Sequence, residues 1–530
     1  MYKIALIFEN REFEHDIYEL IRAFYAGCEI TELYTSNFQE HQTDAAENDS
    51  AVEETQNLSA YDILFTIRKE QAHPEDTACF IIEYKGTDGE GEISIPVTEG
   101  QDELTSDALI SCMNEVHAIR KANKDRIKYA LYKELEKMTG RSLPWGNLTG
   151  IRPVKLAMGM IEAGMKNTEA AQTMREKYLV SAKKTALAVT IANRERDILS
   201  RFDYKNGYSL YIGIPFCPSI CLYCSFSSYP LKQWKTKVDA YLDALCKEIR
   251  AVAQMMKGKK LDTIYIGGGT PTTLEADQLE RLLAEISSCF DVHRLEEFTI
   301  EAGRPDSITK EKLEAISHYP VTRISVNPQT MNQQTLDLIG RKHTVEEVES
   351  IYNLARELGF DNINMDLIVG LPGENIDMVR HTLEEMKRLK PDSLTVHSLA
   401  VKRAARLNIF REKYQEMSFE NNQEIIDLTM QAAYEMGMGP YYLYRQKNMK
   451  GNFENVGYAT VDKAGIYNIL IMEEKQSIIA LGSGGASKIL VRNGMENQIE
   501  RIENVKDVKN YIERIDEMIE RKKKGIEKWL

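Results

Sequence analysis

The chain has 530 residues, of which 43% are hydrophobic, enough for a large core and about three or four domain-sized units. Its formal net charge of −14 argues against nucleic-acid binding, which depends on neutralising phosphates. No stretch approaches the ~20 apolar residues of a membrane span, and the apolar run Ile4–Phe8 is too short for a signal peptide. We therefore expect a cytoplasmic protein with neither a nucleic-acid nor a membrane partner.

Residues 1–100 predict a small N-terminal α/β domain. Apolar residues at helical spacing favour a helix over Arg11–Tyr25, and alternating apolar runs between turn residues favour strands. These strands are expected at Tyr2–Phe8, Tyr61–Ile67, Thr77–Tyr84 and Glu92–Val97. The domain carries no recognisable chemistry, so we interpret it as a docking or scaffolding domain.

Residues 101–204 predict a helical connecting region, with helices over 103–138, 152–163 and 168–199. Leu143–Val154 concentrates Pro, Gly, Trp and Arg between the first two helices. Two interpretations stay open. Trp145 anchors a rigid turn by packing, or Arg152 binds a substrate carboxylate, for which a guanidinium is well suited.

Three thiols follow a predicted strand at Ser209–Ile214, as Cys217, Cys221 and Cys224 in a C-x3-C-x2-C pattern. Thiolates are soft ligands that suit an iron–sulfur cluster, and three of them leave one iron of a four-iron cube open. A structural zinc site needs a fourth protein ligand, and the nearest spare thiol, Cys246, falls in a helical pattern. A disulfide framework is not expected in so large a chain without a secretion signal.

Residues 205–404 alternate strand, loop and helix, which indicates a parallel sheet with right-handed crossovers. The strands are predicted at Ser209–Ile214, Thr263–Ile266, Glu297–Ile300, Arg323–Val326, Asn362–Ile368 and Ser393–Val396. Functional residues in such folds gather at the carboxyl ends of the strands. The cysteine pattern and the chain's other polar motifs all follow these strand ends.

Residues 405–530 predict a last α+β region. A helix is expected at Asn421–Met436, and a hairpin is expected from Tyr467–Met472 and Ser477–Leu481. The run Gly482–Ser487 offers main-chain donors near the strand ends or forms a flexible turn. A charged helix begins at about Val505.

The cysteine pattern after a strand, with Tyr223 just before the third Cys, resembles that of the radical S-adenosylmethionine (SAM) enzymes. The lead-in from Tyr211 to Cys217 and the later motifs resemble the oxygen-independent coproporphyrinogen III dehydrogenases, and among these the HemZ branch. The resemblance covers roughly residues 205–490. It implies an α/β fold with a radical SAM partial (β/α)6 barrel core at 205–404, and with the 405–530 domain covering the barrel mouth.

The resemblance also implies the site residues. Cys217, Cys221 and Cys224 would hold a [4Fe-4S] cluster. SAM would be bound by residues at matching motif positions, namely Tyr211, Tyr223, Gly268, Gly269, Thr270, Glu301, Gln329, Arg341, Asp366 and Ala400. Consecutive glycines let the backbone approach a ligand closely. An Asp inside an apolar strand needs a buried partner, for which ribose hydroxyls or Arg341 are candidates.

The implied activity is an oxidoreductase reaction in porphyrin and haem biosynthesis. One electron from the cluster, supplied by a donor such as flavodoxin or ferredoxin, would cleave SAM to methionine and a 5′-deoxyadenosyl radical. Oxidative decarboxylation would then convert two propionates of coproporphyrinogen III to vinyl groups, giving protoporphyrinogen IX. We expect a monomer and assign no catalytic residue. Candidates for binding substrate acids are Arg152, Arg304, His397, Lys402 and Arg403.

One departure keeps other functions open. Phe226 stands where established dehydrogenases of the family often carry a further Cys, and haem chaperones among their relatives share the form seen here. The alternatives are a haem chaperone, another radical SAM reaction on a tetrapyrrole such as ring opening or methyl transfer, and an unrelated zinc-stabilised interaction module.

Overall fold

The computed structural model describes residues 2–25, 27–34, 58–71, 77–98, 109–226, 228–402, 405–410, 419–446, 453–493 and 496–530. These fall into two compact units, one with residues 1–153 and 159–189 and the other with residues 154–158, 190–449 and 453–530. The division into four regions stays a prediction. No helix of the described residues is both long and apolar enough to cross a membrane.

The first unit contains a five-stranded sheet of order β2-β1-β3-β4-β5, parallel where β1 meets β2 and β3 and antiparallel beyond. Its strands are β1 (Lys3–Phe8), β2 (Glu29–Tyr34), β3 (Ile63–Glu70), β4 (Cys79–Gly86) and β5 (Gly89–Pro96). Helix α1 (Glu14–Phe24) buries Ile17, Leu20, Ile21 and Phe24, and it packs with the sheet and with α2 (Leu109–Thr139) around one core. β2 was not predicted.

The helix predicted over 168–199 is two helices, α4 (Asn167–Glu176) and α5 (Ala182–Leu199). The break is stabilised by the Trp145 turn, because Ser181 N donates to Pro144 O at 3.0 Å. Trp145 is fully buried, which confirms the packing-anchor interpretation. Gly146 has φ 56°, and a Cβ there would meet Tyr178 O at 2.0 Å. Arg152 directly precedes α3 (Pro153–Glu162), and its role toward a substrate stays a prediction.

The second unit is built on an 11-stranded sheet of order β14-β15-β13-β12-β11-β10-β9-β6-β16-β17-β18. Six neighbouring strands are parallel and connected through helices, which confirms the α/β class and the six-unit core. These strands are β6 (Gly207–Ile214), β9 (Lys260–Gly268), β10 (Glu297–Gly303), β11 (Arg323–Val326), β12 (Ile363–Val369) and β13 (Ser393–Ser398).

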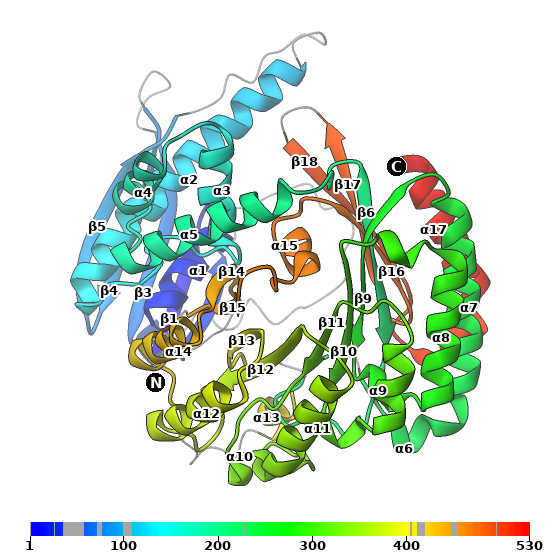
Figure 1. The fold of residues 1–530 in the computed structure, drawn as a ribbon. Coiled ribbons are helices and arrows are strands. Elements are labelled where there is room, and N and C mark those ends of the chain that lie inside the picture. Colours follow the sequence, from blue (N-terminus) through cyan, green and yellow to red (C-terminus); the bar gives the residue numbers. More distant parts are fainter. Residues whose placement is uncertain are drawn as a thin grey trace. The chain divides into compact units, whose positions relative to one another are not determined.

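Amphipathic helices follow the parallel strands, and Figure 1 shows α7, α8 and α9 lined up along the outer side of β6, β9 and β10. The helices are α7 (Val238–Met255), α8 (Ala276–Cys289), α9 (Lys310–Ser317), α11 (Val345–Glu357) and α12 (Ile376–Leu389), with shorter α6 (Leu231–Trp234), α10 (Gln333–Leu338) and α13 (Arg406–Ile409). Their apolar faces pack on the sheet, which leaves the carboxyl ends of the strands free to carry the site.

The C-terminal segments extend this sheet at both edges. β15 (Asn455–Ala459) pairs antiparallel with β13 and with β14 (Gly439–Tyr444). At the other edge β16 (Ser477–Leu481) pairs parallel with β6, and β17 (Ala486–Asn493) and β18 (Glu496–Glu503) continue antiparallel. The remaining helices are α14 (Gln423–Glu435), α15 (Ile466–Met472), α16 (Val508–Glu513) and α17 (Ile515–Trp529).

The predicted hairpin of Tyr467–Met472 with Ser477–Leu481 is wrong. The first segment is the helix α15, and the second is the strand β16. A short apolar run cannot be assigned to a buried helix or a strand by its periodicity alone. The parallel pairing of β16 with β6 joins segments about 270 residues apart, so local sequence does not reveal it.

Candidate functional site

The cysteine loop leaves the end of β6 and lies directly against the glycine turn that follows β9. Gly269 N donates to Ile214 O at 2.7 Å, and Thr270 N donates to Phe216 O at 2.8 Å. A Cβ on Gly269 would lie 2.9 Å from Cys217 Sγ, so only glycine allows this approach. Thr270 Oγ1 also donates to Cys217 Sγ at 3.7 Å. The glycine turn therefore shapes the cysteine loop.

The three sulfurs suit a metal centre that brings its own positive charge. Cys217 and Cys221 are buried, and burial raises the pKa of Cys217 to about 11. Burial also raises the pKa of Cys224. A metal binds the thiolate and not the thiol, so binding has to release protons from these groups. A positively charged cluster would supply the energy for that release.

These three thiols line one cavity of about 600 Å³. Within the described ranges, no three His, Cys, Asp or Glu side chains converge closely enough to hold a single metal ion. The three cysteines line a common cavity that is large enough for a multi-iron cluster and not only for a single ion. The donor set and its surroundings therefore fit an iron–sulfur cube.

The same cavity brings together every other residue predicted to bind the cofactor. Its lining includes Tyr211, Tyr223, Gly268, Gly269, Thr270, Glu301, Gln329, Arg341, Asp366 and Ala400. They come from the carboxyl ends of six neighbouring strands and the loops that follow. Their individual contacts with SAM stay predictions.

Glu301 is the most strongly perturbed carboxyl of the cavity. Burial raises its pKa to about 7, while the hydrogen bond from Tyr265 and the charge of His397 act in the opposite direction. Tyr265 donates to Glu301 Oε1, and the Tyr265 ring stacks on Tyr211 with centroids 6.2 Å apart. Glu301 is therefore held at a fixed place where its charge changes near neutral pH.

Asp366 finds its partners within the protein. Asn364 Nδ2 donates to Asp366 Oδ1 at 2.7 Å, and His397 Nε2 lies 3.7 Å from Oδ2. Although burial acts in the opposite direction, these two partners lower the pKa of Asp366. Arg341, the protein partner expected from sequence, makes other contacts.

The guanidinium of Arg341 binds both the cysteine loop and the segment that follows β11. Its Nη1 donates to Asn327 O at 2.6 Å, and its Nη2 donates to Tyr223 Oη at 3.2 Å. Arg341 Nε and Gln329 Oε1 are buried without a hydrogen-bond partner. Buried polar atoms are rarely left unpaired in native proteins, so both atoms indicate a polar ligand in this cavity.

Several lining residues were not predicted as site residues. Tyr442 and Tyr444 stack with centroids 6.3 Å apart, and both line the cavity with Ser483, Gly484 and Lys506. The Tyr-rich segment and the glycine–serine run were visible in the sequence. Their convergence on the cavity depends on the strand β14 and on the pairing of β16 with β6, neither of which was predicted.

The glycine–serine run lies at the cavity, but its main-chain donors are already used. Gly482 N donates to Glu248 and Ser483 N to Tyr241 Oη, while Gly484 N donates to Val505 O and Gly485 N to Gly482 O. The run is therefore a fixed turn that shapes the wall rather than a set of free donors.

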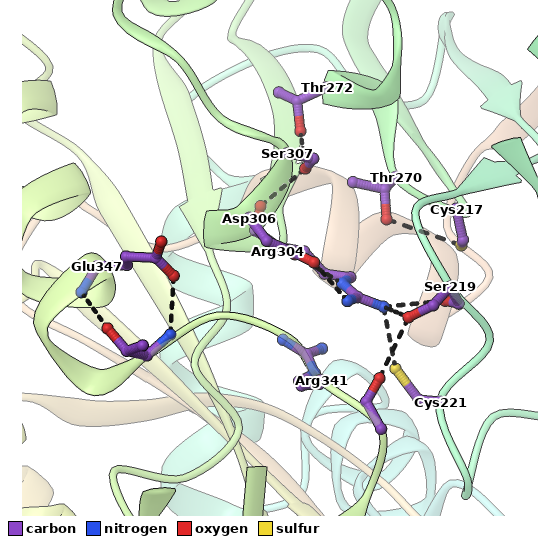
Figure 2. Close-up of polar contacts among 12 residues, drawn as sticks. Cys217, Ser219, Cys221, Thr270, Thr272, Arg304, Asp306, Ser307, Arg341 and Glu347 are labelled. Atoms are coloured by element: carbon purple, nitrogen blue, oxygen red, sulfur yellow. Dashed lines mark hydrogen bonds and ion pairs between the residues drawn. The ribbon is translucent and has the colours of Figure 1, made fainter. Parts of the chain in front are cut away.

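The basic candidates for binding substrate acids have different positions. Lys402 lines the cavity, with its Nζ 5.9 Å from the centroid of Phe226. Phe226 itself is 73% exposed. Arg304 makes buried contacts with the cysteine loop (Figure 2). Arg403 lies outside the described residues.

The pKa of Glu301 leads to a testable pH dependence. SAM carries a positive sulfonium, so a carboxylate facing it favours binding when ionised. With a pKa of about 7, Glu301 should strengthen SAM binding by up to about tenfold as pH rises from about 6 to 8. The measurement is SAM affinity of the cluster-loaded protein and of Glu301→Gln. The ratio of the two affinities cancels the ligand's own titrations, and a ratio that is constant with pH would refute the prediction.

Comparison with known proteins places this site in a family context. Residues 211–386 match the Radical SAM superfamily model. The chain is 42% identical over 419 residues to the oxygen-independent coproporphyrinogen-III oxidase-like protein HemZ of Bacillus subtilis, covering 78% of this chain and 83% of that protein. It is 41% identical over 191 residues to the heme chaperone HemW of Lactococcus lactis, covering 36% of this chain and 48% of that protein.

Among solved structures, the chain is similar to the coproporphyrinogen III oxidase HemN of Escherichia coli. The sequence identity is 25% and the TM-score 0.48, over 60% of this chain and 71% of that chain.

Proposed function

Since this chain belongs to the HemZ/HemN-type family of radical SAM proteins, whose cofactors are a [4Fe-4S] cluster and SAM, we propose that it is an oxygen-independent coproporphyrinogen III dehydrogenase. It would convert two propionates of coproporphyrinogen III to vinyl groups and yield protoporphyrinogen IX. Each conversion would use one SAM to remove a hydrogen atom, release one CO2 and pass one electron to an acceptor. We propose further that it works as a monomer in the cytoplasm and takes electrons from a flavodoxin- or ferredoxin-type donor.

One observation carries the proposal. All thirteen residues predicted to hold cluster and SAM line a single cavity of about 600 Å³, in a chain that shares 42% identity with a coproporphyrinogen-III oxidase-like protein over most of its length. When both are bound, the chemistry that they would supply is the one-electron reductive cleavage of SAM to methionine and a 5′-deoxyadenosyl radical.

The residues of the chain have separate tasks in this proposal. Cys217, Cys221 and Cys224 would hold three irons as thiolates, and the turn at Gly269 brings backbone close to Cys217. Glu301 and Asp366 offer carboxylate oxygens from adjacent parts of the cavity wall. Tyr442 and Tyr444 present an aromatic surface on which a planar or cyclic substrate can rest, and Lys402 offers positive charge to its carboxylates.

A second function is favoured by one residue. Phe226 occupies the position at which established dehydrogenases of the family often have a Cys, and the chain is 41% identical to a heme chaperone over 36% of its length. A haem-delivery protein on the same scaffold would bind and transfer haem without decarboxylating a porphyrinogen.

The mass of the product distinguishes the dehydrogenase from the haem chaperone. The cluster-loaded protein is incubated anaerobically with SAM, a reductant and coproporphyrinogen III, and the porphyrinogens are analysed by mass spectrometry. We expect a product that has lost two CO2. If methionine and 5′-deoxyadenosine form while coproporphyrinogen III is unchanged, the dehydrogenase proposal is wrong. Haem that is bound and passed to an apo-acceptor under the same conditions would establish the chaperone.

A further inference from the structure

Arg304 lies just after β10 and is almost completely buried, with 3% of its surface exposed. Its Nε and Nη2 donate to the two carboxylate oxygens of Asp306 at 2.9 and 2.6 Å. Its Nη1 points the other way, into the cysteine loop, and donates to Ser219 O and Ser219 Oγ, both at 2.9 Å. Figure 2 shows the guanidinium extended between Asp306 and the cysteine loop.

The same Nη1 lies 3.6 Å from Cys221 Sγ, within the range of an N–H···S hydrogen bond. Because Nη1 has two hydrogens and three acceptors, one N–H is shared between Ser219 and the sulfur. Cys221 is the middle thiol of the loop and is itself buried. Nearly all donors of Arg304 are therefore committed to the protein, which leaves it unsuited to the substrate-binding role predicted from sequence.

A further hydrogen bond fixes the backbone of Arg304. Ser307 Oγ donates to Arg304 O at 2.7 Å and pairs with Thr272 Oγ1 at 2.7 Å. Thr272 belongs to the turn that also carries Thr270, the donor to Cys217 Sγ. Two neighbouring strand ends thus aim one donor each at two of the three cysteine sulfurs, as Figure 2 shows.

A hydrogen bond to a cluster ligand lowers the electron density on its sulfur and stabilises the reduced cluster, which has one more negative charge. A cationic donor strengthens this effect in a buried site. The carboxylate of Asp306 partly neutralises the positive charge of the Arg304 guanidinium. It does not remove the Nη1–H that points to Cys221 Sγ. The contact therefore acts in the direction of a higher, less negative reduction potential.

We infer that Arg304 is a positioning residue for the iron–sulfur cluster, which holds the cysteine loop through Ser219 and raises the reduction potential of the cluster through its N–H···S contact with Cys221. The inference depends only on cluster binding and holds for either function proposed above.

The test compares reduction potentials in the full-length, cluster-loaded protein without substrate. The variants are Arg304→Gln, Arg304→Lys and Asp306→Asn, with Arg294→Gln as a matched control, since the Arg294 side chain is 87% exposed. Potentials are read by anaerobic titration followed by absorbance and electron paramagnetic resonance. Arg304→Gln should shift the potential to more negative values, Arg304→Lys should shift it less, and Arg294→Gln should leave it unchanged.

An Arg304→Gln cluster with the wild-type potential would overturn the inference. If that variant holds no cluster, Asp306→Asn decides, because it keeps the guanidinium and removes the compensating negative charge. Its potential should become more positive, and an unchanged potential would overturn the inference as well.

A second readout uses the cluster-free protein. Cys221 should be alkylated faster in Arg304→Gln than in wild type, as measured by mass spectrometry of the labelled peptide. An equal rate would contradict the positioning role. Neither measurement involves substrate, so a failure of the proposed decarboxylation would leave both interpretable.

Discussion

Replacing Cys221 by Ala should abolish cluster binding. The three thiols line one cavity, and each would hold a different iron, so two remaining thiolates would leave two irons of the cube without protein ligands. We expect the anaerobically reconstituted variant to lack stoichiometric iron and sulfide and to lose the charge-transfer absorbance of a [4Fe-4S] centre. The measurement is iron and sulfide per chain together with the visible spectrum.

Cys289→Ser is the matched control for this experiment. Cys289 is a partly buried free thiol at the end of α8, and it does not belong to the cavity lining. The control should bind iron and sulfide as wild type does. Wild-type iron content in Cys221→Ala would show that the three-cysteine loop is not the cluster site.

Replacing Lys522 by Met should destabilise the second unit by about 3–5 kcal/mol, because it leaves a buried carboxylate without its cation. Lys522 and Glu248 are both fully buried, with Nζ 3.1 Å from Oε1. Lys522 Nζ also donates to Ala480 O at 2.9 Å and to Asn504 Oδ1 at 3.0 Å. The pair joins α17 to α7 and to the end of β16.

The same carboxylate fixes part of the cavity wall. Glu248 accepts hydrogen bonds from Gly482 N at 2.9 Å, from Asn504 Nδ2 at 2.8 Å and from Tyr511 Oη at 2.6 Å. Loss of Lys522 should therefore also loosen the Gly482–Gly485 turn, which lines the cavity.

Denaturant-induced unfolding, followed by fluorescence, measures this effect. Lys524→Met is the control, since Lys524 lies on the same helix with 74% of its side chain exposed and only an i,i+4 contact to Glu520 at 3.6 Å. Its free energy of unfolding should stay within about 0.5 kcal/mol of wild type. If Lys522→Met unfolds at the wild-type midpoint, the buried pair does not stabilise this unit.

The core of the fold could be predicted because each of its signals is local. Each parallel strand is a short apolar run bounded by turn residues, and each following helix shows a 3.6-residue period. Polar residues placed directly after such strands, from Cys217 to Ala400, must meet at one edge of the sheet. Their convergence on one cavity could therefore be predicted from the sequence.

What could not be predicted depends on contacts between distant segments. β16 pairs directly with β6, although the two strands are far apart in the sequence, and this pairing helps to bring Ser483 to the cavity. From the sequence, Arg304 was a candidate for binding substrate carboxylates, because no neighbouring residue indicates that Ser219 and Cys221 accept its hydrogen bonds. Asp366 clearly needed a partner, but the sequence could not distinguish Arg341 from Asn364 and His397.

The most direct test of the radical SAM assignment is the cleavage of SAM itself. Protein loaded with its cluster under anoxic conditions is mixed with SAM and a one-electron reductant, and 5′-deoxyadenosine and methionine are quantified by liquid chromatography and mass spectrometry. We predict that both products form with wild-type protein and that neither forms with Cys221→Ala. Wild-type protein that carries its full iron and sulfide, binds SAM and still yields no 5′-deoxyadenosine would contradict the account.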